Sequence, residues 1–60
     1  MDTDRFLTAS AVAKLTTLSR ATIDRKVAAG DMPRPIRLSE RRKAFRESDV
    51  LAWMAEKVAA

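Results

Sequence analysis

The chain has 60 residues, a formal net charge of +4, and neither cysteine nor histidine. A chain of this length forms one small domain, expected here over residues 1–60, with little room for a deep catalytic cleft. The missing cysteine excludes disulfides and thiolate zinc sites, and the missing histidine removes the commonest general base and metal ligand. We therefore expect no enzyme activity, no metal and no cofactor.

Residues 1–6 are mostly polar, and we expect them to be flexible. Thr8 is a favourable N-cap residue, and the sequence after it predicts a short helix over residues 9–16. Val12 and Leu15 are three residues apart, which places both on the inner face of that helix.

A second helix follows after about three residues, the spacing of a helix-turn-helix. Ser19 is its predicted N-cap, and residues 20–29 continue to Gly30, which suits the left-handed position that ends a helix. Ile23 and Val27 are four residues apart and mark the buried stripe.

A short hairpin is predicted next. Two prolines lead into residues 36–38, which alternate apolar, polar and apolar, as a half-buried strand does. Residues 39–41 are polar enough to turn, and residues 42–46 return as a second strand with Phe45 facing inward.

The segment 47–60 has the composition and the periodicity of a helix. Its inner stripe is formed by Val50, Trp53, Met54 and Val58. The predicted fold is therefore α+β, mainly α: a winged helix-turn-helix with a two-stranded wing and a C-terminal helix. This order of elements is one used to bind DNA.

The charge is concentrated in the middle of the chain. Residues 20–46 contain nine cations and three anions, a net charge of +6, whereas the remaining residues sum to −2. A basic middle segment between mildly acidic flanking segments indicates a polyanionic partner, although a basic surface that only keeps the protein soluble has the same composition.

The second helix is the first candidate interface. Arg20 is suited to a bidentate contact with guanine, or it is a solvated residue of the first turn, and Thr22 or Ala21 is suited to a thymine methyl group. Ser19 and the free backbone N–H groups are suited to a phosphate, or Ser19 is simply a cap. Arg25 and Lys26 extend the expected outer face.

Asp24 lies on the same face and repels phosphates. It can accept a hydrogen bond from cytosine N4, or it can pair with Arg20 or Arg25 within the helix. The sequence favours the intrahelical pair.

The hairpin is the second candidate interface, with cations on or beside its tip: Arg37, Arg41, Arg42 and Lys43. Arginine gains from the negative potential of a narrow minor groove, whereas a charged tip can also simply prevent aggregation of an edge strand. Arg34 and Arg46 either serve phosphates or keep the protein soluble.

Three segments resemble the AlpA-like regulators and the small phage excisionases: "VAKLT-x-LSR-x-TI", "G-D-x-P-x-PI-x-L" and "R-ESDV-x-AW". The resemblance implies a MerR-like winged helix-turn-helix that binds double-stranded DNA. It implies a recognition helix carrying Ser19, Arg20, Thr22 and Arg25, and a wing at residues 39–43. Where the family commonly has tyrosine and a leucine-like residue, this chain has Asp24 and Lys26.

The resemblance implies a transcriptional regulator, a recombination directionality factor (excisionase) that binds and bends attachment-site DNA for a tyrosine or serine integrase, or both. We expect the excisionase, because we expect no second domain that senses a ligand or dimerises. A domain of this size buries modest surface, so we expect copies to associate along the DNA. The alternatives are a transcriptional regulator of prophage or integrative-element genes and, from another class, a protein-interaction adaptor. The expected location is the bacterial cytoplasm, at the nucleoid, with no membrane contact.

Overall fold

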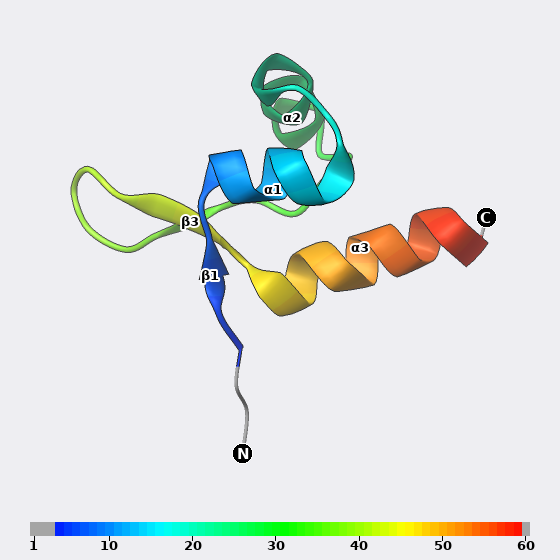
Figure 1. Cartoon of the computed structure of the whole chain (residues 1–60). Helices are drawn as coiled ribbons and strands as arrows, with labels where there is room; N and C mark the ends of the chain where they lie inside the picture. Colours follow the sequence, from blue (N-terminus) through cyan, green and yellow to red (C-terminus); the bar gives the residue numbers. More distant parts are fainter. Residues whose placement is uncertain (1–3, 60) are drawn as a thin grey trace.

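The structure is a computed structural model that describes residues 4–59. Its elements are β1 (Phe6–Leu7), α1 (Ala9–Thr16), α2 (Arg20–Ala28), β2 (Ile36–Arg37), β3 (Lys43–Arg46) and α3 (Glu47–Ala59). The strands form an antiparallel sheet in the order β1-β3-β2. The wing formed by β2, β3 and their loop projects from one side of the molecule, and α3 runs out in the opposite direction (Figure 1). The predicted α+β winged helix-turn-helix class is confirmed.

Local capping explains where the first two helices begin. The Thr8 hydroxyl accepts a hydrogen bond from the Ala11 N–H, and the Ser19 hydroxyl accepts one from the Thr22 N–H, so both predicted N-caps are confirmed. Gly30 has φ 78°, and its N–H donates to the Val27 carbonyl, as expected for the end of α2. Thr17 ends α1 with φ 63°, a left-handed conformation that β-branched residues rarely adopt.

The N-terminal segment differs from its prediction. Residues 1–3 lie outside the described residues, but Asp4, Arg5 and Phe6 are held in place. Phe6 pairs with Arg46 in the sheet. The Arg5 carbonyl accepts a hydrogen bond from the Glu47 N–H, and the Asp4 carboxylate accepts one from the Ser48 N–H. Because α3 follows β3 without a break, residues more than forty positions earlier satisfy its first N–H groups.

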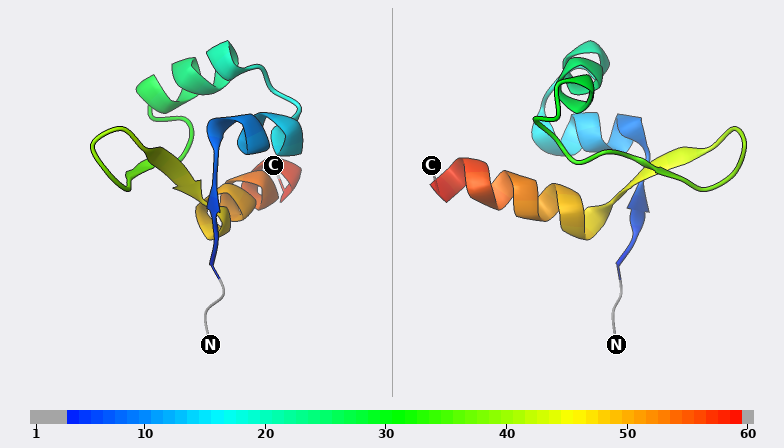
Figure 2. Two further views of the ribbon diagram at one scale, coloured as in Figure 1. Left: turned by 60° about the vertical axis from the view of Figure 1, so that its left-hand side comes forward. Right: turned by 180° about the vertical axis from the view of Figure 1, so that it is seen from behind.

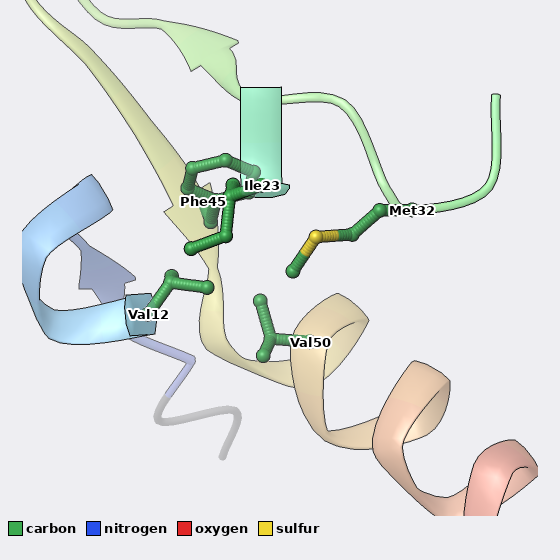
Figure 3. Packing of buried hydrophobic residues seen from close by; sticks show 5 residues of the cluster. All are labelled: Val12, Ile23, Met32, Phe45 and Val50. Atoms are coloured by element: carbon green, nitrogen blue, oxygen red, sulfur yellow. The ribbon is translucent and has the colours of Figure 1, made fainter. Parts of the chain in front are cut away.

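The core lies where α1, α2, β3 and α3 meet. Side chains from each element converge there: Val12, Ile23, Met32, Phe45 and Val50 (Figure 3). Val12, Ile23 and Val50 are completely buried, and Trp53 and Met54 pack against the cluster from α3. Met32, from the loop after α2, was not predicted to be in the core.

Three apolar residues that the sequence placed on inner faces are exposed instead. Val58 is 85% exposed because the last turn of α3 extends beyond the body of the molecule (Figure 1). Leu38 is 48% exposed because it follows the last paired residue of β2 and belongs to the projecting loop. Leu15, at 42%, lies at the rim of the core near the end of α1.

Candidate nucleic-acid interface

Helix α2 presents a mixed outer surface. Ile23 is buried and Val27 is half-buried, so this side of α2 faces the core. At about 100° per residue, Arg20 and Asp24 lie on one flank of that buried stripe, and Arg25 lies near the outermost line. All three are exposed.

The hydroxyl groups of α2 are used within the helix. The Ser19 hydroxyl accepts from the Thr22 N–H and also donates to Thr22 Oγ1 at 2.9 Å. Thr22 Oγ1 in turn accepts from the Arg25 guanidinium at 3.3 Å. Ser19 and Thr22 therefore shape the first turn and orient Arg25, and the exposed cations of α2 are Arg20 and Arg25.

Lys26 lies on the opposite flank of α2 from Arg20. It is half-buried, and its ammonium group pairs with the Asp31 carboxylate at 3.2 Å. Lys57 on α3 pairs with the same carboxylate at 3.7 Å, and the hydrogen bond from Lys26 is the main reason that the pKa of Asp31 is lowered. The expected placement of Lys26 with Arg20 on the outer face does not hold, because Asp31 draws it toward α3.

The wing tip is a tight turn with cations around it. The Arg42 N–H donates to the Ser39 carbonyl, and Leu38 N–H donates back to the Arg42 carbonyl at 2.8 Å. The Arg37 guanidinium donates to the carbonyls of Ser39 and Glu40, at 3.3 and 3.1 Å. Arg37 thus stabilises the turn from its base and is not a free cation.

The remaining wing cations, Arg41, Arg42 and Lys43, are exposed. Within residues 4–59 none of them has a side-chain hydrogen bond or an ion pair. In both views of Figure 2 the loop that carries Arg41 and Arg42 stands clear of the helices. The sequence prediction of a basic projecting tip agrees with this geometry.

Two shallow grooves join α2 to the wing. One, of about 350 Å³, brings Arg20 and Asp24 together with Lys43, over a floor that includes Phe45. The other, of about 300 Å³, brings Arg34 together with Arg37 and Lys43. Arg34 lines this groove, and the sequence left open whether it serves phosphates or keeps the protein soluble. In the sequence Arg34 stands between Pro33 and Pro35, and the proline rings fix the backbone φ angles on either side of it.

The predicted ion pair of Asp24 is wrong. Within residues 4–59 no lysine or arginine nitrogen lies within 4.0 Å of its carboxylate. An arginine four residues before an aspartate is the unfavourable order for a helical pair, and Arg25 is directed toward Thr22. Asp24 is therefore an unpaired anion among cations.

Comparison with known proteins gives one family. The chain matches the family model described as prophage CP4-57 regulatory protein (AlpA) over residues 5–58. No curated protein and no solved structure matches it. Among the described residues, none of the helices has the length and apolar character needed to cross a bilayer.

Proposed function

The chain belongs to the AlpA family of prophage regulatory proteins, which are small DNA-binding regulators, and we propose that it acts as a recombination directionality factor. In this role it binds and bends the attachment-site DNA of a mobile element and favours excision by an integrase. One observation carries the DNA-binding part of the proposal: exposed cations that have no anionic partner within residues 4–59 line a connected surface made by α2 and the wing.

Helix α2 would enter the major groove with its N-terminal residues toward the base edges. Arg20, the first residue of α2, is exposed and able to donate two hydrogen bonds to guanine O6 and N7. Arg25 lies nearer the outermost line of the helix and is suited to a phosphate on one wall of the groove. Ser19 and Thr22 act indirectly, by holding the first turn and orienting Arg25.

The wing would meet the adjacent minor groove. Its tip carries Arg41 and Arg42, and arginine inserted into a narrow minor groove gains from the negative potential there. Lys43 and Arg34, closer to the body, are suited to the phosphates between the two grooves. Arg37 contributes by keeping the turn in shape.

Self-association along the DNA follows from the size of the domain. A single module of this kind buries only about 600–1,000 Å² against DNA, so tight binding depends on neighbouring copies. Apolar side chains exposed at a distance from the wing, such as Leu15 and Val58, support contact between copies. Several copies side by side would hold the DNA in a bent path that a tyrosine or serine integrase uses for excision.

The alternative within the same class is a transcriptional regulator of prophage genes, which the description of the family supports. Both roles use the same DNA-binding surface, so they differ in where the sites lie. A directionality factor occupies repeats beside the attachment site, whereas a regulator occupies promoters.

Footprinting on the attachment region and promoters of the element that encodes the protein separates these roles. The proposal expects protected repeats beside the attachment site and integrase-dependent excision that rises when the protein is added. Protection confined to promoters, with excision unchanged, would make it a regulator only.

A salt titration tests the rival from another class, a protein-interaction adaptor. DNA binding through several phosphates predicts that affinity falls steeply with salt, by about 0.9 in log–log slope for each phosphate. If no duplex is preferred and no such slope is found, the basic surface serves an acidic protein instead.

A further inference from the structure

Among residues 4–59, Asp24 is the one anionic residue that lines the groove shared by Arg20, Lys43 and Phe45. Its carboxylate has no ion pair or side-chain hydrogen bond within residues 4–59. It is the fifth residue of α2. An anion gains from the helix dipole within the first turn, and Asp24 lies beyond that turn. Removing it would therefore cost the fold little.

The surroundings of Asp24 point to a ligand that donates a hydrogen bond. It shares a groove with Arg20 and Lys43, and the cations of the wing lie beyond them. An unpaired carboxylate at that place weakens phosphate binding, because it repels the backbone of any duplex that the groove receives. A hydrogen-bond donor on the DNA at that place would offset the repulsion.

In the major groove the suitable donor is the N4 amino group of cytosine. Adenine also presents an amino group, but the N7 acceptor beside it repels a carboxylate. Arg20 and Asp24 lie four residues apart on one flank of α2, about 6 Å along the helix axis. That separation corresponds to one or two base steps at about 3.4 Å each.

We propose that Asp24 is a specificity residue that accepts a hydrogen bond from cytosine N4, one or two base pairs from the pair that Arg20 contacts. This inference rests on the proposed DNA binding by α2. It goes beyond that proposal by naming the base that this chain selects at one position.

Selection of bound duplexes from a random library tests the inference, followed by affinity measurements on the selected duplex. Wild-type protein should select cytosine at one position, and changing that base should weaken binding about tenfold. Asp24→Ala should bind both duplexes equally. Asp24→Asn should move the preference at that position to adenine, because an amide matches adenine N6 and N7.

Two controls sharpen the experiment. Glu40→Gln removes the same charge from the wing, and it should tighten binding to all duplexes without changing any base preference. Replacing the selected cytosine by 2-pyrimidinone, which lacks the N4 amino group, should weaken wild-type binding about tenfold and leave Asp24→Ala unaffected.

The inference is overturned if Asp24→Ala behaves like Glu40→Gln, with tighter binding everywhere and an unchanged base profile. That outcome leaves the proposed DNA binding intact. A wild-type protein that prefers no duplex at all overturns the proposed function as well, so the two failures are distinguishable.

Discussion

Eight of the twelve cations form two groups that differ in their partners. On the side of β1 and α3, each of four cations has a carboxylate: Arg5 with Glu47 at 2.7 Å, Arg46 with Asp4 at 2.9 Å, and Lys26 and Lys57 with Asp31. On the α2–wing surface, Arg20, Arg41, Arg42 and Lys43 have none within residues 4–59. The presence or absence of a carboxylate partner therefore distinguishes cations that stabilise the fold from cations that are available to a ligand.

The energetics of the two groups differ accordingly. Exposed ion pairs contribute little each, but three of these four join segments far apart in sequence. They hold the N-terminal segment against β3 and α3, and Asp31 links Lys26 of α2 to Lys57 of α3. The unpaired cations form no ion pair within residues 4–59 and repel one another. A polyanion that binds them relieves that repulsion, which is why we assign the DNA contact to them.

The largest expected effect comes from removing the free cations of the wing together. Arg41→Ala, Arg42→Ala and Lys43→Ala combined should weaken DNA binding on the order of a hundredfold at moderate salt and lower the salt slope by up to about 2.7. Arg42→Ala alone should weaken binding broadly and lower the slope by about 0.9. Fluorescence titration of labelled duplex at several salt concentrations measures both quantities.

The matched control removes cations from the other group. Arg5→Ala combined with Lys57→Ala should lower the melting temperature and leave the salt slope of DNA binding nearly unchanged. If Arg42→Ala leaves affinity untouched, the wing does not contact DNA, and the distinction between the two groups fails there.

The next effect concerns Arg20, which we expect to read a base rather than a phosphate. Arg20→Ala should lose about 1–3 kcal/mol of discrimination at one base pair, while binding to unrelated duplexes changes much less. Competition between the selected duplex and single-base variants measures this. Equal weakening on all duplexes would make Arg20 a phosphate contact.

A smaller effect is expected from Trp53, on the partnered side. Its indole N–H donates to the Asp31 carbonyl at 2.7 Å, and Lys57 Nζ lies 5.3 Å from its ring centroid. Trp53→Phe loses the hydrogen bond and should lower the free energy of unfolding by about 1 kcal/mol. Urea denaturation measures the loss, and DNA affinity well below the melting temperature should stay within about twofold of wild type. A large loss of affinity with unchanged stability would place Trp53 at the DNA instead.

The smallest effect is pH-dependent and concerns Asp4. Hydrogen bonding from the Ser48 N–H, reinforced by Arg46 and the Ser48 hydroxyl, lowers the pKa of Asp4 in the folded protein. The folded state therefore binds this proton less tightly than the unfolded state, whose aspartate pKa is about 3.9. The stabilisation is fully present above that value and is lost as the pH falls through the lower folded pKa.

Melting temperatures of wild type and Asp4→Asn across the acidic range measure this difference. Wild type should be the more stable near neutral pH, and the gap should close only below about pH 4. A gap that is constant with pH would mean that the Asp4 charge does not matter to α3.

Local signals in the sequence predicted much of the fold. Thr8 and Ser19 cap helices by contacts three residues away, and Gly30 ends α2 by its own conformation. Contacts between distant segments gave no such signal. A two-residue strand at Phe6, a helix cap supplied by Asp4 and a buried Met32 all depend on chain folding that no local pattern encodes.

The candidate site was predicted to a similar degree. The basic wing tip follows from three adjacent cations after a strand pattern, so the sequence revealed it. Three features of the site depend on which neighbours each side chain meets. Lys26 is separated from Arg20, Arg37 stabilises the wing turn, and Asp24 has no ion pair within residues 4–59. Those neighbours come from other segments: Asp31 for Lys26, the carbonyls of the wing tip for Arg37, and Lys43 of the wing beside Asp24.

The most direct test of the DNA-binding surface is the mapping of backbone amide NMR shifts during titration with a selected duplex. We predict that the largest shifts fall on α2 and on residues 38–44 of the wing, with small shifts for β1 and α3. Shifts concentrated on β1 and α3, or no shifts with any duplex, would contradict the assignment of DNA binding to the unpaired cations.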